Sequence, residues 1–527
     1  MATAEASTLA APLGDALTFP VRVACVDTGS NAIRFLAADF FSETRWHPVH
    51  YERVPIRLGH QVFLSGRLAA EHVDAAVKAF AGFREHLDRL EITHFRAVAT
   101  SAVREARNGE ELVERILTET GIELEMISGS EEARLVHLAV GRRIDLREQK
   151  WLLVDVGGGS VEVSLADDVG MLWAQSHTMG SVRLLEELSV AGDDPGRFRR
   201  LLGEYVSVLR LPSAAAYWQP AGLIATGGNI EALADFVHAT PDERGVARLD
   251  VDDLTSAIEL LARLSFNDKV EQLGLRDDRA DVILPAAMVY ARVAELAQVR
   301  EIQVPFVGVK EGILLDLVDQ FLSRRQHEER QLDQITTASV ALGRRFLFDE
   351  AHGLTVARHA DTLFTQLGAL HGLEARDRLV LRAAAILHDI GLFISYKRHH
   401  HHSLYIISGS ELPGFSPEEM RVVANVARYH RKSGPAPHHE HYMALPDDDR
   451  VRVTQLGALL RLADALDRQH SGMVDDVQAR VEGMGLKLEM TGRGDLLLER
   501  WALTKKKNLF EETFGLKVKV RNRAPAD

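Results

Sequence analysis

The stretch "VDVGGGSVEVS" (residues 154–164) places three consecutive glycines between two short runs rich in valine. Apolar runs on both sides of a glycine turn predict a β-hairpin. Because glycine weakens a strand, three of them at one turn indicate that another group approaches this backbone too closely for a side chain. A similar strand–turn–strand pattern, "VRVACVDTGSNAIRFLAADF" (21–40), lies near the start of the chain. The repeated pattern predicts two related α/β lobes that face one another across a ligand cleft.

The composition is that of an ordinary globular protein. The chain has 527 residues, of which 46% are hydrophobic and 26% are charged, and this length allows about three or four domains. The only cysteine, Cys25, excludes a disulfide framework and a cysteine-based zinc site, and we interpret it as a buried strand residue. No apolar run reaches the roughly 18 residues that a membrane helix needs. We therefore expect a cytoplasmic enzyme without a membrane partner.

The net charge of the chain bears on which binding partners it can have. The formal net charge of −14 argues against non-specific binding to nucleic acid, so we expect no nucleic-acid partner. A local basic groove can oppose the sign of the whole molecule. An anionic substrate is therefore still compatible with this sequence.

Changes in pattern along the chain predict five units. The first twenty residues contain no Lys or Arg, unlike the start of a signal peptide, and strands alternate with helices from residue 21 onward. A charged stretch, "RRQHEERQ" (324–331), precedes a series of amphipathic helices that holds more than half of the 23 histidines. The predicted units are a disordered leader at 1–19, α/β lobes at 20–142 and 143–323, a helical domain at 324–474 and a small strand-bearing domain at 475–527.

Three glycine turns are candidate phosphate sites. Backbone N–H groups of such turns can converge on an anion, and a side chain there would keep the phosphate oxygens out of range. A single turn is explained equally well as a tight hairpin, but three turns in one α/β unit favour phosphate. The candidate residues are Asp27, Thr28, Gly29, Ser30, Asn31, Gly157, Gly158, Gly159, Ser160, Thr226, Gly227 and Gly228.

Acidic residues lie beside these turns. Asp155 and Glu162 flank the triple glycine on the two arms of the predicted hairpin. Two carboxylates beside a phosphate cradle suit Mg²⁺, which takes oxygen ligands, although a pair of solvated acids is the simpler alternative. In "ISGSEEARL" (127–135), Ser130 can cap a helix whose first turn favours Glu131 and Glu132. That structural explanation leaves open that one of the two glutamates faces the cleft.

Together the motifs resemble a known family. They are "VDTGSNAIRFL" (26–36), "ATSAVREA" (99–106), "ISGSEEARL", "VDVGGGSVEV", "MGSVRL" (179–184) and "TGGNIEAL" (226–233). In this order and spacing they are similar to the exopolyphosphatase/guanosine pentaphosphate phosphatase (Ppx/GppA) family, in its long form with a C-terminal HD-like domain. The resemblance covers about residues 20–322 and implies duplicated actin-like (RNase H-like) lobes. Lys310 departs from the pattern, since the family more often has Arg there.

The resemblance implies roles for individual residues. Glu132 would be the catalytic base that orients or deprotonates the attacking water, and Arg104 would contact the phosphate chain. Asp155 and Glu162 would serve a Mg²⁺ site, and the three turns would hold the terminal phosphates through their amides. The implied reaction is hydrolysis of the terminal phosphoanhydride of inorganic polyphosphate, which releases orthophosphate. Such phosphoryl transfer depends mostly on positioning and charge stabilisation, which these residue types supply.

Three alternatives use the same lobes. A guanosine pentaphosphate (pppGpp) 5′-phosphohydrolase would need a guanine pocket, which the sequence does not reveal. A non-catalytic alarmone sensor would have no use for a water-activating carboxylate. An ATP-driven kinase would need an adenosine pocket and a sugar-binding insertion, and neither is recognisable.

The helical region contains a second set of candidates. Its segments "AHGLTVARHA", "ILHDIGLFI", "HHHHSLYI", "RYHRKSG" and "LRLADALDR" follow the order H…HD…H…H…D and resemble an HD-domain phosphohydrolase. Such a set could hold a divalent metal ion, or it could persist as a metal-free helical scaffold. The candidate ligands are His352, His388, Asp389, His402, His430 and Asp464.

Basic residues cluster near these motifs. They could form a track for a polyanion, although a solvated helix face is the simpler alternative. Long members of the family resemble dimers whose C-terminal region helps to enclose a polyphosphate channel, which implies a homodimer here. The candidate track residues are Lys397, Arg398, Arg428, Arg431 and Lys432, with the run 505–507 farther along the chain.

Overall fold

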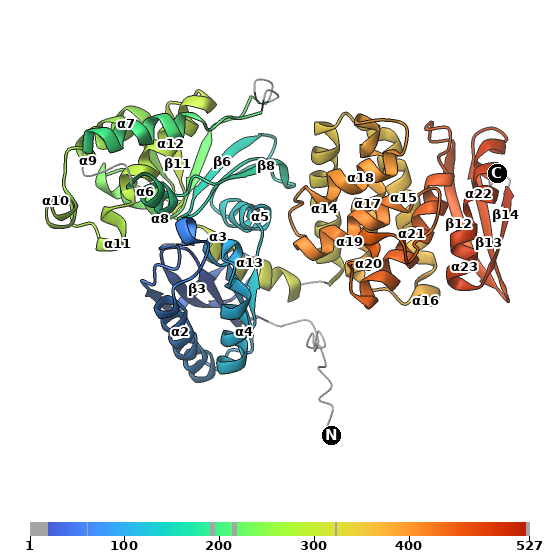
Figure 1. Cartoon of the computed structure of the whole chain (residues 1–527), viewed down its shortest axis with the longest axis horizontal. Coiled ribbons are helices and arrows are strands. Elements are labelled where there is room, and N and C mark those ends of the chain that lie inside the picture. The colour runs from blue at the N-terminus through green and yellow to red at the C-terminus, as the bar shows by residue number, and fades with distance from the viewer. Residues whose placement is uncertain are drawn as a thin grey trace.

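The protein is described by a computed structural model that covers residues 19–60, 62–189, 195–212, 215, 219–321 and 324–522. The leader predicted at 1–19 lies almost wholly outside these described residues. An α/β part and a helical part lie side by side along the long axis, and a small sheet forms the end beyond the helical part (Figure 1). Across the described residues, no helix is both long enough and apolar enough to span a bilayer.

The first lobe is built on a five-stranded sheet with the order β3-β2-β1-β4-β5. β1 pairs antiparallel with β2 and parallel with β4, so the predicted first hairpin is confirmed. The strands are β1 (Val21–Thr28), β2 (Ile33–Phe40), β3 (Trp46–Val54), β4 (His94–Ala99) and β5 (Leu124–Met126). The helices are α1 (Val62–Ser65), α2 (Ala70–Arg89), α3 (Ser101–Glu105), α4 (Gly109–Thr120) and α5 (Gly129–Val140).

The second lobe repeats this arrangement. Its sheet has the order β10-β11-β9-β6-β7-β8, in which β6, β7 and β8 pair antiparallel while β6, β9 and β11 run parallel. The strands are β6 (Trp151–Val156), β7 (Val161–Ala166), β8 (Met171–His177), β9 (Leu223–Thr226), β10 (Ala247–Asp250) and β11 (Glu301–Val304). The helices are α6 (Ser181–Ser189), α7 (Pro195–Ser207), α8 (Gly228–Phe236), α9 (Val251–Leu261), α10 (Phe266–Glu271), α11 (Asp277–Ala280) and α12 (Ile283–Ala297).

The shared strand order confirms the predicted pair of actin-like lobes. The two lobes are joined by a common core, because helix α13 (Val309–Phe321) follows the second sheet but packs against α5, β1 and β4 of the first. A Cβ atom on Gly312 would lie 2.0 Å from the carbonyl oxygen of Leu135 in α5, so this contact is close. The Cys25 thiol donates to the carbonyl of Lys310 (3.2 Å), and its burial on β1 agrees with our interpretation.

The helical domain and the small sheet complete the chain, and the predicted fold class is confirmed. The helices are α14 (Arg324–Arg345), α15 (Glu350–Gln366), α16 (Gly368–His371), α17 (Ala375–Leu387), the 3₁₀ helix η2 (Ile390–Phe393), α18 (His399–Ser408), α19 (Pro417–Arg428), α20 (Glu440–Met443) and α21 (Asp447–Ala465). The small sheet has β12 (Val474–Glu482), β13 (Gly485–Gly492) and β14 (Lys517–Asn522), with α22 (Leu497–Lys506) and α23 (Asn508–Phe514). One hydrophobic core runs through both. The predicted boundaries between the units stay predictions.

The loop after α18 connects the helical domain to the first lobe. The amide of Gly414 donates to Glu131 Oε2 (3.0 Å), and the amide of Ser130 donates to Glu411 Oε2 (3.3 Å). Both contacts reach the first turn of α5. The helical domain therefore touches the same helix that carries the predicted catalytic base.

A buried histidine makes this domain sensitive to acid. His359 on α15 is 2% exposed, and burial together with the nearby Arg358 charge lowers its pKa to about 4. Between this value and an unfolded value near 6.5, only the unfolded state binds the proton, so stability falls as the pH falls. At pH 5 the expected loss is about 2 kcal/mol.

The variant His359→Leu is expected to shrink the difference in melting temperature between pH 7 and pH 5, as measured by calorimetry of the full chain. His441→Leu, at an exposed position, is the matched control and should keep the wild-type difference. Equal acid sensitivity in His359→Leu and the wild type would contradict the assignment.

Candidate active site

The three glycine turns meet in one cleft between the lobes. The cleft encloses about 210 Å³ and receives residues from the β1–β2 turn, the β6–β7 turn and the β9–α8 turn. The predicted site residues that line it are Asp27, Gly29, Ser30, Asn31, Glu132, Asp155, Gly157, Gly158, Gly227 and Gly228. The predicted residues that lie outside this lining are Thr28, Arg104, Gly159, Ser160, Glu162 and Thr226.

The triple glycine has a structural cause that the sequence did not reveal. A Cβ atom at position 158 would lie 2.7 Å from Ser30 Cβ, and one at 159 would lie 2.4 Å from Phe63 Cζ. Both neighbours belong to the first lobe. The contact between lobes, and not only a ligand, therefore excludes side chains at positions 158 and 159, and Gly157 and Gly158 also line the cleft.

Gly180, just before α6, closes the other side of this turn. A Cβ atom at position 180 would lie 2.3–2.4 Å from the backbone of Gly158 and Gly159. Because backbone cannot move aside cheaply, Gly180→Ala is expected to destabilise the protein by about 1–3 kcal/mol or more. Thermal unfolding would measure the loss. Gly82→Ala in α2 is the matched control, because no atom lies within 4 Å of its added Cβ, and a loss as large there would contradict the argument.

The carboxylates of Asp27, Glu132 and Asp155 line the cleft, and Glu162 pairs with Asp155 in the sheet outside the lining. Asp155 and Glu162 are paired residues of β6 and β7, so their side chains share one face of the sheet. Burial, followed by the charges of Glu162 and Asp27, raises the pKa of Asp155 to about 7. Burial and the Glu162 charge raise the pKa of Glu132 well above its usual value. Such crowding of buried acids favours a bound cation.

Two oxygens of this group are available to such a cation. Glu132 Oε2 and Glu162 Oε2 are both buried, and neither has a hydrogen-bond partner among the described residues. The other Glu162 oxygen accepts from Ser176 Oγ at 2.9 Å. Carboxylate oxygens suit the hard, oxygen-ligated chemistry of Mg²⁺, but none of the groups of three close ligand atoms among the described residues includes Glu132, Asp155 or Glu162, so the Mg²⁺ site stays a prediction.

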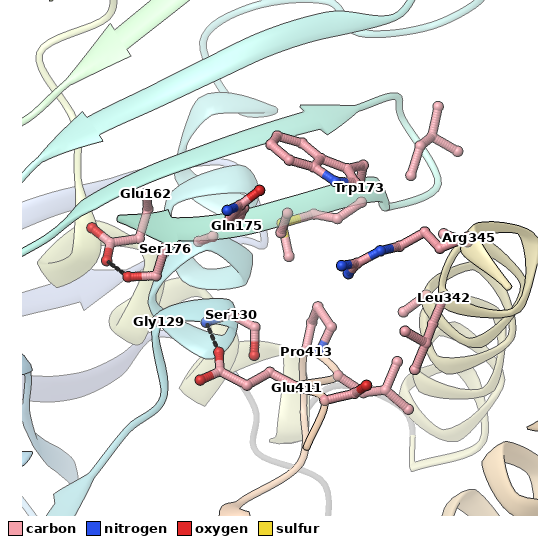
Figure 2. Close-up of a pocket in the computed structure, with 18 of the residues that line it drawn as sticks. Gly129, Ser130, Glu162, Trp173, Gln175, Ser176, Leu342, Arg345, Glu411 and Pro413 are labelled. Atoms are coloured by element: carbon pink, nitrogen blue, oxygen red, sulfur yellow. Dashed lines mark hydrogen bonds between the residues drawn. The ribbon is translucent and has the colours of Figure 1, made fainter. Parts of the chain in front are cut away.

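Glu162 also borders a second cavity, of about 270 Å³, between the second lobe and the helical domain. Figure 2 shows Glu162 and Ser176 on the strands at one side, Ser130 at the start of α5, and Arg345 and Glu411 approaching from the helical domain. The Ser130–Glu411 bond crosses this space. Glu162 therefore lies between the cleft and the domain boundary.

The structure separates the two adjacent glutamates. Glu131 is held away from the acid cluster by Arg134 (2.7 Å) and Arg96 (3.3 Å), and the same two arginines contact Asp316. Glu132 is the one that lines the cleft. The expected helix cap was wrong, because the Oγ of Ser128, not of Ser130, accepts from the Glu131 amide.

Five cationic residues of the cleft were not predicted as site residues. Arg34 donates to Asp27 Oδ2 (2.9 Å), and Arg279 donates to Asn229 Oδ1 (2.6 Å). Burial and the charges of Arg34 and Arg276 lower the pKa of Arg279 to about 10, so it stays charged at neutral pH. The full set is Arg34, Arg53, Arg276, Arg279 and Lys310. Cations that repel one another in a cleft favour an anionic ligand.

Arg104 does not line the cleft, but its charge acts on two of the nearby carboxylates. Its Nη1 donates to the carbonyl of Ile127 (2.5 Å), and its charge lowers the pKa values of Glu132 and Glu162 against their burial. In this arrangement Arg104 stabilises the ionised acids. Its predicted contact with the phosphate chain stays a prediction.

The helical domain assembles most of its predicted ligands. His352, His388 and Asp464 form one triad, and Asp389 and His430 belong to another. The prediction of His402 as a ligand was wrong, because His402 lies outside both triads. His399, at the first position of α18, occupies the place predicted for His402. Four consecutive histidines gave no sequence signal for which of them joins the triad. His399 and His400 are both buried, and the contacts of His399 with Asp389 and His430 decide it.

The predicted track residues surround one pocket beside these triads. The pocket encloses about 740 Å³. Its lining includes all five candidates, Lys397, Arg398, Arg428, Arg431 and Lys432, and also His400, His401, His438 and His439. No described residue that lines it is acidic. The lining is therefore suited to an anion.

Comparisons with known proteins show what the chain is similar to. Residues 41–321 match the Ppx/GppA phosphatase family, and residues 335–512 match domain III of Ppx/GppA phosphatases. "Exopolyphosphatase 1" of Mycobacterium tuberculosis is 29% identical over 306 residues, which are 57% of this chain and 89% of the relative. A solved exopolyphosphatase from Cytophaga hutchinsonii is 27% identical with a TM-score of 0.53, over 57% of this chain and 100% of that one. A solved exopolyphosphatase-like protein is also 27% identical over the same shares, with a TM-score of 0.51.

Proposed function

The chain belongs to the Ppx/GppA phosphatase family, and we propose that it is an exopolyphosphatase that hydrolyses the terminal phosphoanhydride of inorganic polyphosphate. One observation carries this proposal: the buried carboxylate of Glu132 faces a cleft that is lined by glycine turns and by five cationic side chains. A water-activating acid beside an anion site is the arrangement that hydrolysis of a phosphate chain needs.

Each part of the cleft has a role in the proposed reaction. Arg34, Arg279 and Lys310 hold the oxygens of the terminal phosphates, and the free amides at the start of α8 add donors. Glu132 orients the attacking water and accepts its proton as the phosphoanhydride bond breaks. Orthophosphate then leaves, and the shortened chain is the second product.

Mg²⁺ is the proposed cofactor. Asp155, Glu162 and the free oxygen of Glu132 would hold it, since their buried and mutually repelling carboxylates fit a divalent cation. When bound, it would neutralise charge on the phosphate oxygens. Burial and the Glu162 charge raise the pKa of Glu132, and the Arg104 charge opposes that rise; a bound cation would oppose it further and so favour the ionised form that the base must have to accept a proton.

The second candidate substrate is pppGpp, whose terminal phosphates would use the same turns. The relatives that carry the name exopolyphosphatase favour polyphosphate. The deciding experiment is phosphate release by the purified chain with Mg²⁺, on long-chain polyphosphate and on pppGpp in parallel. Faster turnover of polyphosphate is expected. A preference for pppGpp would replace the proposal, and activity on neither, with the protein folded, would favour a sensor.

We also propose that the protein is a cytoplasmic homodimer. Several large apolar side chains of η2 and its surroundings are exposed, and such a patch is typical of an interaction surface. The patch consists of Leu392, Phe393, Ile394, Tyr396 and Tyr405. Light scattering of the purified chain is expected to give the mass of two chains, and Phe393→Asp is expected to lower it to that of one.

A further inference from the structure

A cluster of two histidines and a glutamate lies in the first lobe, outside the lining of the cleft. His50 and Glu52 belong to β3, and His86 belongs to α2. His86 Nε2 lies 2.7 Å from Glu52 Oε2, and His50 Nε2 lies 3.9 Å from the same oxygen. Each side chain therefore offers one ligand atom, and these atoms lie within 4.8 Å of one another.

The strand pairing explains why the three side chains meet. His50 and Glu52 are two positions apart on β3, so both point to one face of the sheet. Glu52 is paired with Phe35 of β2, whose ring stacks on that of Phe83 of α2 with 5.4 Å between the centroids. His86 follows Phe83 by three positions and so lies on the same side of α2. One face of the sheet and one side of the helix thus form the cluster.

An apolar floor lies under the cluster. The ring centroid of Phe35 lies 5.8 Å from that of His50 and 5.8 Å from that of His86. Phe35 itself is fully buried. An apolar shell limits the access of water and strengthens the attraction between a cation and a carboxylate. The floor therefore favours an ion that is held by the protein over one that is fully hydrated.

One nitrogen of the cluster lacks a partner. His50 Nε2 is buried, and it has no hydrogen-bond partner among the described residues. Leaving a buried polar atom unpaired destabilises a fold. A cation bound at this nitrogen would remove that cost, because it would accept the lone pair of the imidazole.

The spacing of the ligand atoms fits zinc. Ligand atoms about 2.0–2.2 Å from a tetrahedral Zn²⁺ lie roughly 3.3–3.6 Å apart. The two measured separations, 2.7 and 3.9 Å, lie on either side of this range, so small rotations of the side chains would reach it. Two imidazoles and one carboxylate are a donor set of zinc sites with three protein ligands, in which water takes the fourth position.

Arg89 is the group that opposes a cation here. Its Nη2 donates to Nδ1 of His86 at 2.8 Å, so Nε2 carries the proton in this structure and donates it to Glu52. Binding of an ion moves this proton to Nδ1, frees the Nε2 lone pair and displaces the Arg89 side chain. Arg89 is exposed at the last position of α2, where an arginine loses little by turning to water.

We propose that this cluster is a zinc site that fastens β3 to α2, with His50, Glu52 and His86 as ligands and water in the fourth position. It goes beyond the polyphosphate hydrolysis proposed above and does not depend on it. The opposite face of β3 carries Tyr51 and Arg53, and both residues line the cleft. An ion on one face would therefore hold in place the strand that presents these two residues on the other.

The first test counts zinc ions. The full chain is freed of metal with a chelator, dialysed to equilibrium against micromolar Zn²⁺ and measured by plasma mass spectrometry. His50→Ala and His86→Ala are each expected to bind one ion fewer per chain than the wild type. His47→Ala, at an exposed position of the same strand, is the matched control and should lose none. An unchanged count in the first two variants would overturn the proposal.

The second test locates the ion, because other histidines of the chain are also grouped closely enough to bind zinc. Hydrogen–deuterium exchange of the full chain is measured with and without Zn²⁺. The ion is expected to slow exchange in β3 and in the last two turns of α2 of the wild type, but not in Glu52→Gln. That variant keeps the shape of the side chain and lacks only the carboxylate. Protection that is absent from the wild type, or that survives unchanged in Glu52→Gln, would overturn the proposal.

Arg89→Gln provides a test in the opposite direction. Removing the charge and the donor beside His86 is expected to raise the affinity for the ion that is lost in His50→Ala by about 3–10-fold, as measured by competition with a fluorescent chelator. Arg84→Gln is the matched control, because Arg84 lies on the same helix but pairs with Asp88 (2.8 Å). Its affinity for zinc should stay within roughly twofold of the wild type. Equal affinities in the two variants would contradict the role of His86 as a ligand.

Discussion

Glu132→Gln is expected to lower the rate of phosphate release from polyphosphate by about 10²–10⁴-fold, while polyphosphate binding stays largely intact. The amide keeps the shape of the side chain but cannot accept the proton of the attacking water. The residue is buried at the base of the cleft, and the positive charges that would hold the chain come from other residues. Binding would be measured by equilibrium titration and turnover by phosphate release. An equal loss of binding would contradict the role of base.

Glu131→Gln is the matched control for this substitution. It changes the neighbouring glutamate on the same helix, but that carboxylate is paired with Arg134 and Arg96 and faces away from the cleft. The variant is expected to melt at a lower temperature and to keep activity within roughly threefold of the wild type. If Glu131→Gln instead lost most of its turnover, the two glutamates would have to exchange roles.

Arg279→Met is expected to lower kcat/KM for polyphosphate by about 10–100-fold, mainly through KM, because hydrogen bonds to charged groups contribute about 1.5–3 kcal/mol each. Arg279 is 7% exposed and lies beside the start of α8, where a Cβ atom at position 228 would lie 2.5 Å from its Nη2. Burial, together with repulsion from Arg34 and Arg276, lowers the pKa of Arg279. Removing it should therefore leave the melting temperature unchanged or raise it, which is typical of a residue kept for function.

The control for this experiment is Arg263→Met. Its side chain is 77% exposed and lies just beyond α9, outside the cleft lining. The substitution removes the same charge from the whole molecule and should leave kcat/KM unchanged. A similar loss in both variants would mean that net charge, and not position, governs the affinity.

The local sequence patterns predicted the glycine turns, but they did not predict the residues from distant segments that pack around those turns. Two hairpins of similar sequence were enough to predict duplicated lobes, because each turn is determined by consecutive residues. Arg53 and Arg279 reach the same cleft from segments more than 200 positions apart in the numbering, and no local pattern marks either as a partner of the glycine turns. The cause of the triple glycine was missed for the same reason, since Phe63 meets Gly159 only when the lobes are packed.

The second limit on prediction from the sequence was the rotational position of side chains around a helix. On α18, four identical side chains follow one another, and their composition gives no indication of which one is buried. The backbone places His399 inside and leaves His402 half-buried outside the triads. In the first turn of α5, the family resemblance singled out Glu132, and the geometry explains the choice: Glu131 is already held by two arginines.

The bonds from Glu411 and Gly414 to the first turn of α5 give the molecule a mechanical link. The loop that makes them belongs to the helical domain, and the helix that receives them carries Glu132. A ligand that displaces this loop would change the free energy of arranging Glu132 for its reaction. Thermodynamic reciprocity then requires that substrate binding in the cleft change the affinity for that ligand by the same factor. Such a ligand would couple the helical domain to the cleft in energy through one short segment.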